Sequence, residues 1–154
     1  CDMRYASADA FFVITEIDSG MVADVGTLQR LPLLMPDGLM RELAYTGRRL
    51  PADEAKACGL VNAVFADPAA LVTGVLEIAR VIAAKSPLAI AGTKEILNYG
   101  RDHTVADGLN YIATWNAGML VTGDMPEAFA ATAQKRDATF DDIVAEVPIA
   151  KARG

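Results

Sequence analysis

Short apolar runs dominate the first part of the chain, and their β-branched and aromatic residues predict strands. Two such runs span residues 1–6 and 10–16. The tripeptide Asp18-Ser19-Gly20 then indicates a turn, because Asp and Ser hydrogen-bond their own backbone while Gly tolerates a left-handed conformation. Residues 25–31 fit a short helix that ends at Pro32, since proline favours helix boundaries.

Beyond Pro32 the apolar positions recur mainly at helical spacing. Glycine commonly closes helices, and proline suits their first position. The predicted elements are a helix ending at Gly47, a helix over 52–57, a strand over 60–65, a helix beginning at Pro68, and a helix from Pro87 to about Tyr99.

Two further helices are predicted from capping patterns. The pattern Thr104-x-x-Asp107 predicts a capping box that opens a long helix. Asp124-x-x-Glu127 is expected to open the last helix in the same way. The chain should therefore begin with strands and short helices and continue as a series of longer helices.

Composition excludes several classes of protein. Hydrophobic residues make up 53% of the chain, enough to bury a core, and the net charge of −6 argues against a nucleic-acid-binding surface. The basic doublets Arg48-Arg49 and Lys135-Arg136 could touch phosphates, although single doublets are usually solvated. Cys1 and Cys58 are too few for a disulfide framework. No apolar run reaches the ~18 residues that suggest a membrane span.

Glu16 and Asp24 are the candidate chemical groups, in a segment that is otherwise mostly apolar and contains Gly20 and Gly26. Apolar surroundings make it costly to ionise a carboxyl, so two acids in different environments can divide the work of proton transfer. The predicted helix at 25–31 should favour ionised Asp24 through its dipole. Apolar neighbours should favour protonated Glu16. Spacing alone favours simpler interpretations: Asp24 as an N-cap and Glu16 as a solvated strand end.

Three motifs occur in order along the chain. They are the strand Cys1-Asp2-Met3-Arg4-Tyr5-Ala6, the acidic Glu16 followed by Gly20, and the block from Thr46-Gly47 to Gly59-Leu60-Val61-Asn62-Ala63-Val64. Together they resemble the crotonase (enoyl-CoA hydratase/isomerase) superfamily. Most hydratases of the superfamily have Gly where this chain has Asp24. The segment around Asp24 resembles the dienoyl-CoA isomerase subfamily instead, as do Arg101-Asp102-His103 and residues 109–116.

The resemblance implies an α/β fold. Residues 1–65 should form the C-terminal portion of a crotonase-like ββα spiral core, and residues 66–154 a helical region that provides oligomerisation helices. Only the C-terminal part of the family domain is matched, and the chain begins at Cys1 rather than Met. The part not matched would carry the oxyanion hole and a third acidic residue. We therefore expect a fragment, or one piece of a site completed elsewhere.

The resemblance also implies an activity. An acyl-CoA isomerase would shift a 3,5-diene to a 2,4-diene, with Glu16 acting at C2 and Asp24 at C6. An enoyl-CoA hydratase, using Glu16 and a second acid from the missing part, is one alternative. A catalytically incomplete oligomerisation module is the other. No permanently bound cofactor and no metal are expected, since coenzyme A enters as part of the substrate thioester.

Two residues near the end of the chain are candidates for binding coenzyme A. By resemblance, Phe140 would contact the adenine ring and Lys135 a phosphate; the alternative is a basic helix end followed by a core Phe. Homotrimers or hexamers are implied, with no nucleic-acid or membrane partner. The protein would be cytoplasmic in a bacterium and mitochondrial or peroxisomal in a eukaryote. His103, the only histidine, is expected in a loop or on the surface.

Overall fold

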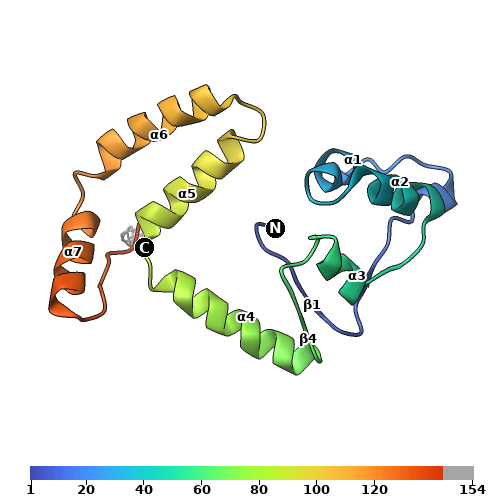
Figure 1. Cartoon of the computed structure of the whole chain (residues 1–154), viewed down its shortest axis with the longest axis horizontal. Helices are drawn as coiled ribbons and strands as arrows, with labels where there is room; N and C mark the ends of the chain where they lie inside the picture. The colour runs from blue at the N-terminus through green and yellow to red at the C-terminus, as the bar shows by residue number, and fades with distance from the viewer. Residues whose placement is uncertain (144–154) are drawn as a thin grey trace, which may run out of the picture. The chain divides into compact units, whose positions relative to one another are not determined.

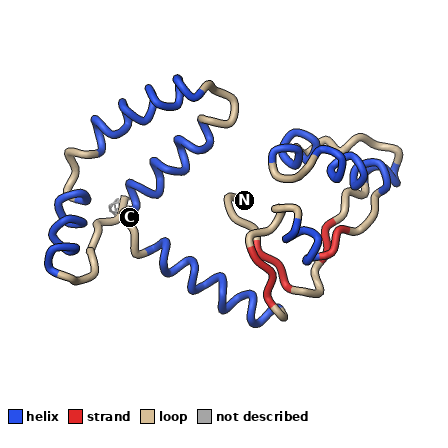
Figure 2. The backbone as a smooth tube through the Cα atoms, in the orientation of Figure 1, coloured by secondary structure: helices blue, strands red, loops and turns tan. Residues whose placement is uncertain are grey.

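The strands are shorter than the sequence pattern predicts. In the computed structural model, which describes residues 1–143, β1 (Tyr5–Ser7) pairs in parallel with β4 (Ala63–Phe65), and β2 (Phe11–Phe12) pairs antiparallel with β3 (Leu50–Pro51) (Figure 2). The predicted strand over 10–16 is confirmed only at Phe11–Phe12, and its last position, Glu16, begins a short 3-10 helix instead. The predicted strand over 60–65 is confirmed only from Ala63 onward.

Short helices connect these strands. They are η1 (Glu16–Ser19), α1 (Thr27–Arg30), η2 (Leu31–Leu33), α2 (Asp37–Thr46) and α3 (Ala52–Ala57) (Figure 1). The helix predicted over 25–31 begins two residues later, because Gly26 adopts a left-handed φ of +93°. Pro32 does not end the helical stretch but lies inside η2, at a position where its missing N–H costs nothing.

A single apolar cluster joins β1, β3, α2, α3 and the connections between them. The buried side chains of the α2 stripe, Met40 and Leu43, are part of it, which confirms the helical face predicted before Gly47. The buried members are Ala6, Ile14, Ala23, Met35, Met40, Leu43, Leu50, Ala52, Ala55, Leu60 and Val61. Cys58 packs against the same cluster.

The longer helices follow as predicted. They are α4 (Pro68–Ala83), α5 (Pro87–Tyr99), α6 (Val105–Met119) and α7 (Asp124–Gln134), and α5 packs beside α6 (Figure 1). Gly74 of α4 lets the Phe65 ring approach so closely that a Cβ there would overlap it. Trp115 of α6 lies against Gly92 of α5 in the same manner.

The helix caps confirm one prediction and correct another. Thr104 and Asp107 form the capping box, with the Asp107 N–H donating to Thr104 Oγ1 and the Thr104 N–H donating to Asp107 Oδ2, both at 3.2 Å. The capping box predicted at Asp124 is wrong. Gly123 is the N-cap of α7 without a side-chain hydrogen bond, and the Asp124 carboxylate instead accepts from the Ser86 hydroxyl.

The chain divides into two units, residues 1–78 and 79–154, with the boundary inside α4. The family-based division at 65/66 stays a prediction, and residues 144–154 of its helical region lie outside the described residues. Among the residues that the structure describes, no helix is both long enough and apolar enough to cross a membrane.

Candidate functional site

Glu16 lies at the start of η1, in the connection between β2 and α1. The Met21 N–H donates to the Glu16 carbonyl at 3.0 Å, and the Gly20 N–H donates to the Ile17 carbonyl at 3.1 Å. Gly20 closes the turn with a φ of +70°, which a residue without Cβ adopts easily. The Glu16 side chain is half-buried within this turn, so the interpretation as a solvated strand end is wrong.

Asp24 is exposed and lies later in the same connection. It does not cap α1, because the cap residue is Gly26 and the first turn of α1 holds no acidic residue. The interpretation of Asp24 as an N-cap is therefore wrong. The structure thus brings Glu16 and Asp24 into one connection of the first unit, where the two side chains differ in their access to solvent.

Two core residues anchor the stretch that carries the carboxylates. Ile14 is 8% exposed and Ala23 is 6% exposed, and both belong to the buried cluster. Glu16 follows Ile14 by two positions, and Asp24 directly follows Ala23. Core packing therefore sets the backbone positions from which both carboxylates extend.

Apolar side chains around these carboxylates are open to solvent. Val22 is 75% exposed and Val25 is 83% exposed, and Ile17 and Met21 are also exposed. A cluster of exposed apolar side chains is typical of a surface that meets a ligand or another protein segment. The connection therefore combines two carboxylates with an apolar surface.

The turn that holds Glu16 also meets the end of α2. Gly47 closes α2 with a φ of +62°, and a Cβ at this position would lie 3.0 Å from Asp18 Oδ2. Only glycine combines this left-handed conformation with so close a neighbour. Gly47 therefore lets η1 pack against α2.

Arg48 joins α2 to α3 by ion pairs. Its Nε donates to Glu42 Oε1 at 2.6 Å, and its Nη1 donates to Glu54 Oε2 at 2.9 Å. The hydrogen bond from Arg48 lowers the pKa of Glu54. Arg49 lies over the Phe11 ring, with its guanidinium carbon 4.1 Å from the ring centroid. Arg48 of this doublet is therefore engaged within the protein rather than free to bind a phosphate.

Lys135 and Phe140 belong to the segment that follows α7. Lys135 ends the helix with a left-handed φ of +53°, and its side chain is exposed. Phe140 is half-buried and lines a cavity of about 300 Å³ in the second unit. The structure thus places one candidate on the surface and the other at a cavity wall.

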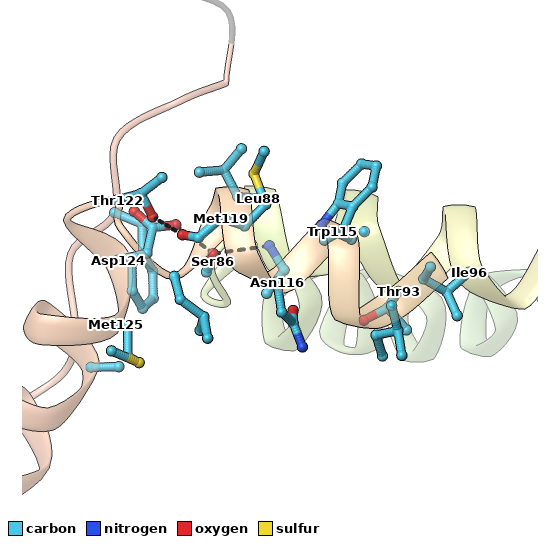
Figure 3. A pocket seen from close by; sticks show the side chains of 16 residues that line it. Ser86, Leu88, Thr93, Ile96, Trp115, Asn116, Met119, Thr122, Asp124 and Met125 are labelled. Carbon is cyan, nitrogen blue, oxygen red and sulfur yellow. Dashed lines mark hydrogen bonds between the residues drawn. The ribbon is translucent and has the colours of Figure 1, made fainter. Parts of the chain in front are cut away.

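Helices α5, α6 and α7, together with the residue before α5 and the α6–α7 connection, form the rest of that cavity (Figure 3). Its apolar wall includes Ile96, Trp115, Met119 and Met125, and its polar groups include Asn116 and the Ser86–Asp124 pair. A mainly apolar cavity with a few polar groups is the usual form of a small-molecule site.

Glu127 was expected only as part of a helix-capping pattern, and the structure gives its carboxylate a different set of partners. Its carboxylate accepts from Arg136 Nη1 at 2.6 Å and Nη2 at 2.8 Å, and from the Thr139 N–H at 2.9 Å. The hydrogen bonds from Arg136, and next from Thr139, lower the pKa of Glu127 to about 2. No helical period links positions 127 and 136, so the sequence pattern gave no signal.

His103 is exposed in the α5–α6 connection, as predicted. Its ring stacks on Tyr99 with centroids 3.7 Å apart, and Nδ1 lies 2.8 Å from the Tyr99 carbonyl and 2.7 Å from Asp102 Oδ1. The hydrogen bond to the Tyr99 carbonyl is the main cause that raises the pKa of His103. Within residues 1–143, no group of three or more His, Cys, Asp or Glu side chains is arranged to hold a metal ion.

Comparison with known proteins identifies a family that matches this chain and relatives that resemble it. The family described as Enoyl-CoA hydratase/isomerase matches residues 1–143. The human mitochondrial Delta(3,5)-Delta(2,4)-dienoyl-CoA isomerase is 47% identical over 89% of this chain and 42% of its own length. The peroxisomal protein of that name from Arabidopsis thaliana is 49% identical over 91% of this chain and 50% of its own length. The chain spans about half the length of these relatives.

Solved structures agree with the fold. A crystal structure of enoyl-CoA hydratase from Bacillus anthracis has a TM-score of 0.87 and 35% identity, covering 91% of this chain and 54% of the other. An enoyl-CoA hydratase from Mycobacterium tuberculosis has a TM-score of 0.87 and 31% identity, covering 92% and 56%. The α/β fold expected from the sequence is confirmed by these neighbours.

Proposed function

Because this chain belongs to the enoyl-CoA hydratase/isomerase family, we propose that the protein isomerises 3,5-dienoyl-CoA thioesters to 2,4-dienoyl-CoA thioesters. Relatives that are 47% and 49% identical carry the name of this isomerase. The observation that carries the proposal is the presence of a second carboxylate, Asp24, in the same connection as Glu16. Two carboxylates can divide a proton transfer between distant carbons, one acting as the base and the other as the acid.

The proposed reaction moves one proton without a net redox change. Glu16 removes a proton from C2, and the electron pair spreads over C2, C4, C6 and the thioester oxygen. Hydrogen-bond donors outside this chain would stabilise the charge on that oxygen. Asp24 then delivers a proton to C6, so that the double bonds at C3 and C5 become double bonds at C2 and C4. This direction needs an ionised Glu16 and a protonated Asp24, the reverse of the charge states expected from the sequence. The helix-dipole argument for an ionised Asp24 does not apply, because Asp24 does not cap α1. Positioned general acids and bases of this kind accelerate reactions by about 10²–10⁴-fold.

Coenzyme A would enter only as part of the substrate, with no permanently bound cofactor. Phe140 would contact the adenine ring, and the exposed Lys135 ammonium group would contact a phosphate. The aromatic ring offers a stacking surface, and the lysine offers a point charge that suits phosphate. The protein would work in the cytoplasm of a bacterium, or in mitochondria or peroxisomes of a eukaryote. The names of two eukaryotic relatives place one in mitochondria and the other in peroxisomes.

A homotrimer or hexamer is proposed as the working form. Helices of the second unit expose large apolar side chains, among them Leu97 and Phe129, each 68% exposed. These side chains are suited to contacts between subunits. They also keep open the second candidate function, in which the chain serves as a non-enzymatic oligomerisation module.

The experiment that tests the proposal is Asp24→Asn in the full-length protein, followed by a spectroscopic assay of diene conversion. We expect isomerisation to fall by roughly 10²–10⁴-fold because the C6 proton donor is lost. Asp9→Asn, which removes an exposed carboxylate in the β1–β2 turn, is the matched control and should leave the rate unchanged. Retained isomerisation in Asp24→Asn would contradict the proposal. Hydration of an enoyl-CoA by that variant would then favour the hydratase alternative.

A further inference from the structure

The segment after α7, residues 135–140, forms an arm that reverses the chain at the helix end. The Arg136 N–H donates to the Ala131 carbonyl at 3.0 Å, and the Lys135 N–H donates to the Thr132 carbonyl at 3.2 Å. These bonds satisfy carbonyls at the end of α7, in the manner of a left-handed helix cap. They fix only the beginning of the arm, and beyond Arg136 the arm belongs to no helix or strand.

A single carboxylate holds the rest of the arm. Glu127, in the first turn of α7, binds Arg136 through both terminal nitrogens and also accepts from the Thr139 N–H. One side chain therefore fixes two positions of the arm that are three residues apart. The paired geometry of a guanidinium on a carboxylate gives direction as well as attraction.

The arm connects the two residues proposed to bind coenzyme A. Lys135 lies at its start on the surface, and Phe140 lies at its end against the cavity. Thr139, which Glu127 binds through its backbone, directly precedes Phe140. Fixing Thr139 therefore fixes the point from which the Phe140 ring extends into the cavity wall.

We propose that Glu127 is a positioning residue, which holds the arm so that Phe140 and Lys135 are already in place when an acyl-CoA thioester binds. The inference rests on the proposed function, and it assigns Glu127 no contact with the reacting carbons. Without the clamp, a segment outside any helix or strand would have to lose conformational freedom upon binding, which weakens affinity. The chemical step, carried by other carboxylates, should be unaffected.

The test compares Glu127→Ala with Glu127→Gln in the full-length protein. Glu127→Ala removes both attachments, whereas Glu127→Gln keeps an amide oxygen that can accept from the Thr139 N–H. We expect Glu127→Ala to raise KM for the dienoyl-CoA by about tenfold with kcat within about twofold, since only binding is affected. Glu127→Gln should raise KM by less. Arg136→Lys, which keeps the charge but loses the paired geometry, should resemble Glu127→Gln.

Trp115 provides a readout that does not depend on activity. It is the only tryptophan in the chain, and it lines the same cavity as Phe140. Its fluorescence should change when free coenzyme A is added to the unmodified protein, and the midpoint should move to higher coenzyme A in Glu127→Ala. Asp37→Asn, which breaks an exposed ion pair with Arg41 on α2, is the matched control and should leave the midpoint unchanged.

The outcomes separate this inference from the proposed function. An unchanged KM and an unchanged coenzyme A midpoint in Glu127→Ala and Arg136→Lys would overturn the positioning role, even if the protein is an isomerase. The positioning role would also be overturned if kcat of Glu127→Ala fell in proportion to a loss of folded protein measured by circular dichroism. If the unmodified protein shows no isomerisation, the proposed function fails, and the fluorescence midpoints alone decide the role of Glu127.

Discussion

The connection that carries Glu16 and Asp24 and the arm that carries Lys135 and Phe140 are held in place by different forces. Backbone hydrogen bonds and the buried side chains of Ile14 and Ala23 hold the connection. The charged pair of Glu127 and Arg136 holds the arm. Core packing carries no charge that salt can screen or pH can titrate, whereas an ion pair at the surface responds to both. The arm that carries the proposed binding groups should therefore respond more strongly to salt and pH than the connection that carries the proposed catalytic groups.

The largest effects should come from the two carboxylates of the connection. In Glu16→Gln, we expect isomerisation to fall by roughly 10²–10⁴-fold and deuterium uptake at C2 of the substrate to stop, because the C2 base is lost. In Asp24→Asn, uptake at C2 should continue while diene conversion falls by roughly 10²–10⁴-fold. Mass spectrometry of substrate incubated in heavy water measures both. The opposite pattern would reverse the assignment of the two residues.

Removing a core anchor should destabilise the connection without touching its chemistry. Ile14→Ala leaves a cavity in the buried cluster, so we expect the free energy of unfolding to fall by about 3 kcal/mol. Denaturant titration followed by circular dichroism measures this change. Val13→Ala, at a side chain that is 41% exposed, is the control and should cost much less. Equal losses for both variants would show that Ile14 does not anchor the connection.

A side chain at Gly47 should weaken the contact between η1 and α2 and destabilise the fold. Gly47→Ala adds a Cβ in a left-handed conformation and against Asp18, and we expect a loss of about 1–2 kcal/mol in unfolding free energy. The double variant Gly47→Ala with Asp18→Gly removes the crowding and should recover part of this loss. No recovery would mean that backbone conformation alone accounts for the cost.

The smallest effect should be the pH dependence of the arm. Arg136 and the Thr139 N–H lower the pKa of Glu127 to about 2 in the folded chain, below the ordinary glutamate value of 4.5. The stabilisation is therefore present above pH 4.5 and is lost as the pH falls toward 2. Thermal unfolding of the unmodified chain and of Glu127→Gln should differ near neutral pH and converge near pH 2. If the difference in unfolding temperature between the two proteins did not change with pH, the ionised Glu127 carboxylate would not be the source of the stabilisation.

Local signals explain what the sequence predicted well. Prolines at helix starts and the Thr104–Asp107 capping box act within one turn, and the helices they predict are present. Helical spacing likewise placed Met40 and Leu43 on the buried face of α2. The motifs resembling the crotonase superfamily predicted the fold, which the solved structures confirm.

Tertiary contacts explain what the sequence pattern missed. Asp124 looked like a helix cap, but its carboxylate accepts from Ser86, a residue of another helix start. Arg48 looked like half of a solvated doublet, but two carboxylates on different helices bind it. Ser86 lies 38 positions from Asp124, and Glu42 and Glu54 lie on two different helices, six positions to either side of Arg48, so no spacing within one helix predicts these contacts. The roles of Glu16, Asp24, Lys135 and Phe140 stay predictions until the variants are measured.

The parallel pairing of β1 with β4 has a consequence for how the chain folds. Arg4 next to β1 and Asn62 next to β4 are 58 positions apart, and they are joined by a hydrogen bond. Contacts of such high contact order form late, because the closure of a long loop must come first. On a ribosome that adds ~5–20 residues per second, β1 would wait roughly 3–12 seconds for its partner strand to be synthesised. The α5–α6 hairpin needs no such delay, so the second unit can acquire its contacts soon after its helices emerge.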